Sequence, residues 1–203
     1  MRARVVAGAA MAVLLACSLA LSGCSSDDAS STAASTSASP SPTPTPSSVV
    51  WAGEVCVARD GLSTAVSALG RNLNYDVTSD RSALEQIDRQ LRLQVVALGN
   101  AADNLATALQ GVPVDFQAAS DLVTTVTKAK TDMTESLAAA KSSLDQMVAS
   151  DNLLTGAAEA AKALVAAKAA FEAGQAMVTA LTDAASGANA ELKEAFDAAP
   201  QCQ

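Results

Sequence analysis

The chain has 203 residues and a net charge of −8; 50% of the residues are hydrophobic, only 2% are aromatic and none is histidine. Alanine occupies 47 positions, a composition that favours long helices over sandwiches or barrels built on aromatic and β-branched side chains. The absence of histidine removes the most common general base and the most common transition-metal ligand. An acidic chain does not neutralise phosphates, so we expect no nucleic-acid partner.

The first 24 residues have the layout of an export signal. Basic residues near the start precede an apolar stretch, which ends in the sequence Leu21-Ser22-Gly23-Cys24. These four residues resemble the lipobox of bacterial lipoproteins. The resemblance implies that residues 1–23 are removed as a signal peptide and that Cys24 is acylated. The protein is then anchored on the extracytoplasmic face of the cell membrane. The alternatives are an ordinary secretory signal and a transmembrane anchor with an incidental cysteine.

The charge of the processed chain indicates how it is held at the membrane. Residues 1–23 contain two arginines and no acidic residue, so the rest of the chain has 11 basic and 21 acidic residues, a net charge of −10. Anionic lipid head groups repel such a surface, whereas each buried methylene of an acyl chain adds about 0.8 kcal/mol of membrane affinity. We therefore expect the bilayer to be bound through lipid on Cys24 and not through charge.

A low-complexity segment follows the lipobox. Residues 24–49 comprise the expected lipidated cysteine and a stretch dominated by Ser, Thr, Ala and Pro, without apolar periodicity. Such a segment buries too little apolar surface to fold, and we expect it to be a disordered linker. Its Pro-rich part favours polyproline II, and 24 residues at about 3.1 Å each span at most roughly 70 Å. The tether and the Ala-rich body resemble lipoproteins of high-GC Gram-positive bacteria.

Residues 50–203 carry the spacing of amphipathic helices. Their apolar residues form four stripes, separated at 74–80, at 111–113 and at 150–152. This pattern predicts an all-α fold: an antiparallel bundle of four long helices, up-down-up-down, with coiled-coil-like seams rich in alanine. Glycines 174 and 187 are two places where the fourth helix could be split. The second stripe comprises Leu84, Ile87, Leu91, Val95, Leu98, Ala102, Leu105 and Leu109; the fourth includes Leu154, Ala157, Ala161, Leu164, Phe171, Val178 and Leu181.

Local signals mark the helix ends. Ser82 and Glu85 have the spacing of a capping box at the start of the second helix. Gly111 and Pro113 predict its end. The oxygen-bearing residues from Asn74 to Glu85 also alternate as in a calcium loop, but the sixth position lacks the glycine that an EF-hand needs. We therefore interpret this segment as a connection between helices and predict no metal site.

The cysteines provide a test of the helix count. Cys17 lies in the expected signal peptide and Cys24 is the expected lipidation site, which leaves Cys56 and Cys202 in an oxidising compartment. A disulfide requires Cα atoms within about 7 Å. An even number of antiparallel helices brings the chain ends together, so we predict a Cys56–Cys202 disulfide. Two free thiols or an intermolecular bridge are the alternatives.

Nothing in the sequence points to catalysis. A Ser-His-Asp or Cys-His site is impossible without histidine, and no Gly-rich loop follows a strand. Seven charged residues of the second half alternate in sign, as on a solvated surface. We therefore expect no enzyme, no catalytic or cofactor-binding residue and no cofactor, but a non-enzymatic contact, spacer or accessory module with an envelope protein as partner. The alternative is a binder of a small apolar or amphipathic ligand between the helices. The seven residues are Glu135, Lys141, Asp145, Glu159, Lys162, Lys168 and Glu172.

Overall fold

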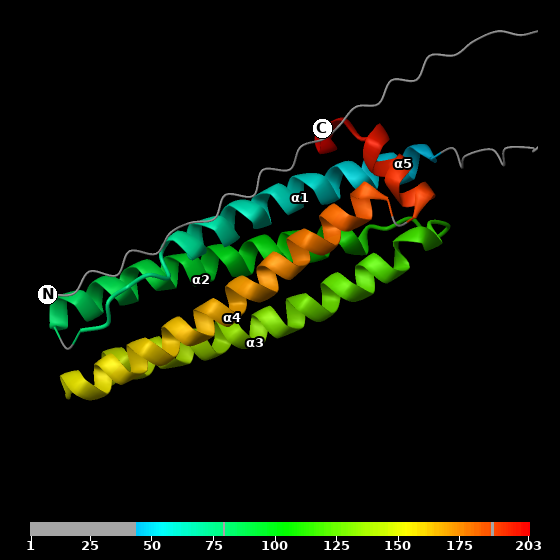
Figure 1. Ribbon diagram of the computed structural model, residues 1–203. Helices are drawn as coiled ribbons and strands as arrows, with labels where there is room; N and C mark the ends of the chain where they lie inside the picture. The colour runs from blue at the N-terminus through cyan, green and yellow to red at the C-terminus, as the bar shows by residue number, and fades with distance from the viewer. Residues whose placement is uncertain (1–43, 79, 188) are drawn as a thin grey trace, which may run out of the picture. The chain divides into compact units, whose positions relative to one another are not determined.

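A computed structural model describes residues 44–203 except 79 and 188, and every regular element of these residues is a helix. Four long helices follow one another up and down, as expected (Figure 1). A short fifth helix follows near the end of the chain. The fourth apolar stripe, for which the sequence left open one long helix or a split one, is therefore divided between two helices. The helices are α1 (Pro46–Arg71), α2 (Arg81–Gln110), α3 (Ser120–Ala149), α4 (Leu153–Ser186) and α5 (Ala190–Ala198), with 3₁₀ turns η1 (Gln117–Ala119) and η2 (Pro200–Cys202).

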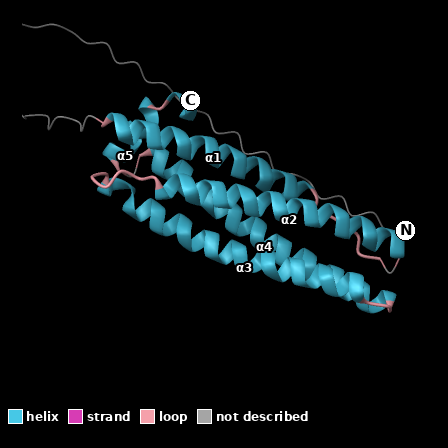
Figure 2. Cartoon of the chain, turned by 180° about the vertical axis from the view of Figure 1, so that it is seen from behind, coloured by secondary structure: helices cyan, strands magenta, loops and turns pink. Residues whose placement is uncertain are grey.

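The bundle is built from two helical hairpins, α1–α2 and α3–α4. Of all helix pairs, α3 and α4 make the most extensive contact, followed by α1 and α2, whereas any one pair of helices from different hairpins makes less contact. Figure 2 shows the same arrangement from behind, with α3 and α4 side by side along their lengths. The contact between the hairpins is therefore spread over several helix pairs, α2 with α3, α1 with α4 and α2 with α4.

Helix α1 begins earlier than the composition indicates. We expected linker up to residue 49, but the helix starts at Pro46, whose fixed φ suits the first helical position. Thr45 is the N-cap, and its Oγ1 accepts a hydrogen bond from the backbone N–H of Ser48 at 3.3 Å. The Ser48 hydroxyl donates to the Thr45 carbonyl at 2.8 Å and is buried. The expectation was wrong for 45–49 because capping residues resemble linker residues in composition; residues 24–43 lie outside the described part.

Helix α2 shows the predicted stripe but not the predicted cap. All eight residues of its stripe are buried. The N-cap is Asp80 and not Ser82, because Asp80 Oδ1 accepts hydrogen bonds from the backbone N–H groups of Ser82 at 2.8 Å and Ala83 at 3.2 Å. The Ser82 hydroxyl donates to the same oxygen at 2.6 Å. Together these hydrogen bonds, that of the hydroxyl first, lower the pKa of Asp80 below its ordinary value.

The face of α4 that packs against the core is not the face that carries most of its larger apolar residues. Leu154 is 73% exposed, and Leu164, Phe171 and Val178 are only partly buried. Small residues fill the interface instead, which lets α4 approach its neighbours closely. The prediction was wrong for these four residues, although Leu181 of the same stripe is buried. Alanine occurs on every side of this helix, so that the size of the side chains and not their hydrophobicity decides which face packs. The buried residues of α4 are Gly156, Glu159, Ala160, Ala163, Ala167, Ala170, Gly174, Met177, Leu181 and Ala184.

The two glycines of the predicted fourth helix behave differently. Gly174 lies within unbroken helix, whereas α4 ends at Ser186 and Gly187 follows with φ +129°, a left-handed conformation that favours glycine. Asn189 then caps α5 by accepting from the backbone N–H of Glu191 at 3.0 Å. The split that the sequence left open therefore occurs at Gly187.

The bundle contains its own core. The buried hydrophobic residues of the described part lie between Trp51 and Ala199, and the described residues from 44 to 203 belong to one compact unit. We therefore take residues 39–203 as a unit that folds by itself.

Candidate functional site

The two ends of the bundle differ, and one of them is closed by the predicted disulfide. Cys56 on α1 and Cys202 in η2 are bonded, with Cα atoms 5.3 Å apart across 146 positions of sequence. The structure thus brings together the two cysteines that the sequence paired. Cys24, the expected lipidation site, lies outside the described residues.

Aromatic packing completes this disulfide end. Trp51 is 2% exposed and meets Phe116 edge-on with ring centroids 5.5 Å apart. Its second aromatic neighbour is Phe196 of α5, at 6.0 Å. These contacts join α1, the α2–α3 connection and α5, so Trp51 fills the end of the bundle beside the disulfide.

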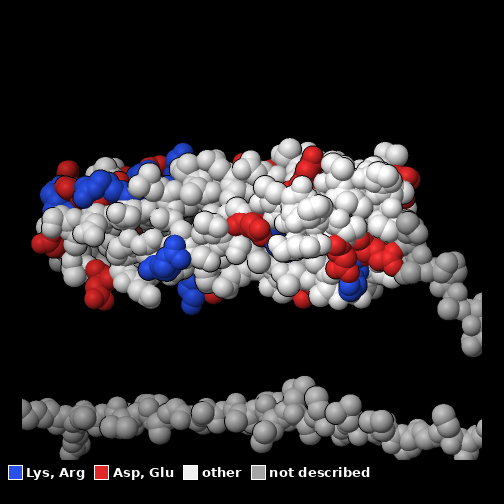
Figure 3. Space-filling model, turned by 90° about the horizontal axis from the view of Figure 1, so that it is seen from above, with Lys and Arg blue, Asp and Glu red and all other residues white. Residues whose placement is uncertain are grey.

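Most charged side chains lie on the surface, but one does not. Of the seven charged residues expected to be solvated, Glu159 is the exception, only 8% exposed. Glu159 Oε1 accepts a hydrogen bond from Lys162 Nζ at 2.6 Å, and this ion pair offsets part of the cost of burying the carboxylate. Figure 3 shows one face of the bundle, on which small groups of charged side chains are separated by broad uncharged areas.

Two sets of ion pairs connect the hairpins. Arg92 of α2 donates to Asp145 of α3 at 2.7 Å and to Asp88 on its own helix at 2.6 Å. The Asp145 contact, followed by that of Asp88, raises the pKa of Arg92 against an opposing effect of burial. Asp103 and Lys130 form a second α2–α3 pair at 2.9 Å. These ion pairs hold α2 against α3, and their residues do not form a recognisable catalytic site.

The described residues were also compared with the requirements of a metal site and of a membrane-spanning helix. Within 44–203, leaving out 79 and 188, no group of three or more Cys, Asp or Glu residues could hold a metal ion. No helix in the same part of the chain is both long and apolar enough to cross a bilayer.

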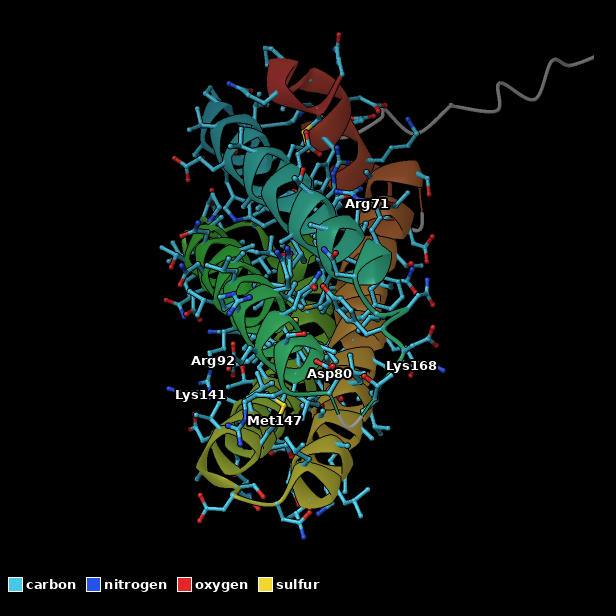
Figure 4. The ribbon with its side chains drawn as sticks, turned by 90° about the vertical axis from the view of Figure 1, so that its left-hand side faces the viewer. Arg71, Asp80, Arg92, Lys141, Met147 and Lys168 are labelled. Atoms are coloured by element: carbon cyan, nitrogen blue, oxygen red, sulfur yellow. A yellow bond between two sulfur atoms is a disulfide. The ribbon has the colours of Figure 1, made fainter. Side chains whose placement is uncertain are left out.

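One hollow lies at the end of the bundle opposite the disulfide. We call it the distal cleft: a cavity of about 210 Å³ between the first turns of α2, the last turn of α3 and the first turns of α4. Figure 4 looks onto this end, with Met147 between α2 and the α3–α4 hairpin. The cleft lies where the start of α2 meets the α3–α4 turn.

Apolar and polar side chains both line the distal cleft. Leu84 and Met147 are buried and form the floor of the cleft. Gly156 also lines the cleft, and it has no side chain that would fill the space. Two apolar side chains of its wall, Val148 and Leu153, are 64% and 37% exposed. One signal for the cleft is present in the sequence: apolar residues flank the polar turn at 150–152, where a solvated loop would not need them.

The charged side chains of the distal cleft differ in whether they already form an ion pair. Asp88 is held by Arg92 at 2.6 Å, and Glu85 lies 3.9 Å from Arg89. Arg81, at the mouth, is exposed and forms no ion pair with any described residue. Arg81 is therefore the cation of the cleft that remains free for an external group.

A second, shallower groove runs between α1 and α2 near the disulfide. It has a volume of about 720 Å³, and Val50 and Val57 on its α1 side are 64% and 61% exposed. Ala101 and Ala108 line the α2 side. Polar residues such as Glu54 and Asn104 also line this open groove, and none of its lining residues is a lysine or an arginine.

Comparisons with protein-family models, with curated proteins and with solved structures found no match to this chain. The proposals below therefore depend on the sequence and on the geometry described above.

Proposed function

We propose that this chain is a membrane-anchored lipoprotein on the extracytoplasmic face of the cell membrane, and that its bundle is a non-enzymatic contact module. The lipobox at Leu21–Cys24 and the Ser/Thr/Pro segment support the anchor. One structural observation supports the contact role: the chain enters the bundle at the disulfide end, whereas the distal cleft lies at the opposite end.

The dimensions suit a spacer. Helix α2 has 30 residues, and at 1.5 Å per residue it separates the two ends of the bundle by about 45 Å. The tether adds at most roughly 70 Å when extended. An anchored protein of this form would hold its distal end well above the bilayer, where an envelope protein could reach it.

The anchor is tested by two cysteine substitutions that differ only in position. Cys24→Ala should abolish acylation and either leave unprocessed precursor or release the protein into the medium. Cys17→Ala, within the apolar part of the signal, is the matched control and should be acylated and membrane-bound like the unaltered chain. The measurements are intact mass of the mature protein and its partition between membrane and soluble fractions. Soluble, unacylated wild-type protein would refute the anchor.

A further inference from the structure

The distal cleft has the size and lining of a site for a small amphipathic molecule. At about 30 Å³ for a water-sized group, its 210 Å³ has room for roughly seven such groups. This is below the usual range of pockets for drug-sized ligands, so a two-chain phospholipid does not fit. A single short alkyl chain does, and it would lie against Leu84 and Met147.

The lining of the cleft has two arginines and two acidic residues, and of these four only Arg81 lacks an ion pair among the described residues, which favours an anionic head group. Asp80 is engaged by three hydrogen bonds at the start of α2, and Asp88 is engaged by Arg92. Arg81 has no carboxylate partner among the described residues. A guanidinium binds a carboxylate through two parallel hydrogen bonds, and Arg81 is the group at this cleft that is free to do so.

We propose that the distal cleft binds an alkyl monocarboxylate, with its chain between α2 and the α3–α4 hairpin and its carboxylate on Arg81. The site is separate from the anchor, because the acyl chains on Cys24 would be attached at the other end of a tether. It is also independent of the proposed contact role, since residues 39–203 contain the whole cleft.

The methionines supply a local reporter. Residues 39–203 contain Met133, Met147 and Met177, of which only Met147 lines the cleft. Met133 and Met177 are fully buried in the core and serve as internal references. In protein labelled with methyl-¹³C methionine, octanoate should shift the Met147 methyl resonance saturably, in about the millimolar range, and leave the other two unchanged.

Head-group specificity is tested by a pair of arginine substitutions. Arg81→Gln should weaken octanoate binding by about fivefold, the size expected for one exposed ion pair. Arg71→Gln removes another cation that lacks an ion pair, but this residue does not line the cleft, and binding should be unchanged. Octyltrimethylammonium, with the same chain and the opposite charge, should bind more weakly than octanoate to the unaltered protein.

Chain binding is tested by a pair of glycine substitutions. A Cβ at Gly156 would lie 3.4 Å from Leu84 Cδ1, an ordinary contact, so Gly156→Ala should fold while placing a methyl in the floor of the cleft. Octanoate affinity should fall about fourfold, since roughly one methylene of the ligand is displaced. A Cβ at Gly61 would meet nothing within 4 Å, and Gly61→Ala should leave affinity unchanged.

Three results would overturn the proposal. The first is a Met147 methyl that does not move while circular dichroism shows folded protein. The second is an equal shift of all three methionine methyls, which would indicate non-specific partition. The third is equal loss of affinity in the Arg81 and Arg71 variants. None of these results bears on acylation of Cys24, because that residue is absent from the protein tested.

Discussion

Individual glycines of this chain have different roles, which depend on what faces the missing Cβ. At Gly174 an added Cβ would lie 2.7 Å from Val66 Cγ2, closer than packed atoms approach, whereas at Gly61 there is open space. Gly174 therefore allows α4 to pack against α1, and Gly61 only lowers the helix propensity of α1. A sequence pattern does not distinguish the two, because both lie inside regular helix.

Gly174→Ala should accordingly destabilise the protein although alanine is the better helix former. The gain in propensity is at most about 1 kcal/mol, whereas overpacking against the stiff, β-branched Val66 costs typically 1–3 kcal/mol. Gly61→Ala is the matched control and should raise the free energy of unfolding by up to about 1 kcal/mol. Urea unfolding followed by circular dichroism measures both. A Gly174→Ala protein more stable than the unaltered one would show that α1 and α4 are not in this contact.

Helices α2 and α4 show when a hydrophobic pattern predicts the buried face of a helix and when it does not. In α2 the large apolar residues are separated by polar ones, so only one face can be buried, and all eight predicted residues are. In α4 alanine surrounds the helix, and the predicted face followed Leu164 and Val178, which are partly exposed. Because α3 and α4 lie close together, only small residues fit between them. Which face of α4 packs therefore depends on the position of α3, and the sequence of α4 alone does not give that position.

A size increase on the small face of α4 tests that account. Ala167 has no exposed surface, so Ala167→Leu should lower the free energy of unfolding by about 1–3 kcal/mol through overpacking. Ala169→Leu adds the same side chain at an exposed position of the same helix and should change stability by no more than about 0.5 kcal/mol. The readout is again urea unfolding. Equal effects of the two substitutions would mean that the small face is not the packed one.

At the scale of the whole molecule, the sequence predicted the all-α class, the four long helices and the pairing of the chain ends, but not the short α5 or the difference between the two ends. The predictions succeeded because helix length, antiparallel order and the positions of Cys56 and Cys202 constrain one another. The distal cleft depends instead on how the two hairpins meet, because its lining combines the start of α2 with the α3–α4 turn, two segments that are far apart in sequence. No single segment carries a pattern for it.

The disulfide joins the last described turn to the first helix, and its removal should affect the stability of the molecule far more than its fold. The bond closes a loop of 146 positions, for which the chain-entropy model gives at most about 5 kcal/mol and experience typically 2–4. Cys56→Ser with Cys202→Ser in residues 39–203 should therefore lose a few kcal/mol of unfolding free energy, while the helical circular dichroism at 25 °C persists, because the core of the four long helices remains.

Reduction provides the control for that loss. The unaltered protein should gain the mass of two hydrogens and fall to the stability of the double variant when it is reduced, whereas the same reductant should leave the double variant unchanged. Before reduction, thiol titration of folded or unfolded protein should find no free cysteine. Two free thiols per chain under oxidising conditions would refute the pairing. A double variant that loses its helical signal would instead show that the Ala-lined core is too thin to hold the bundle without this bond.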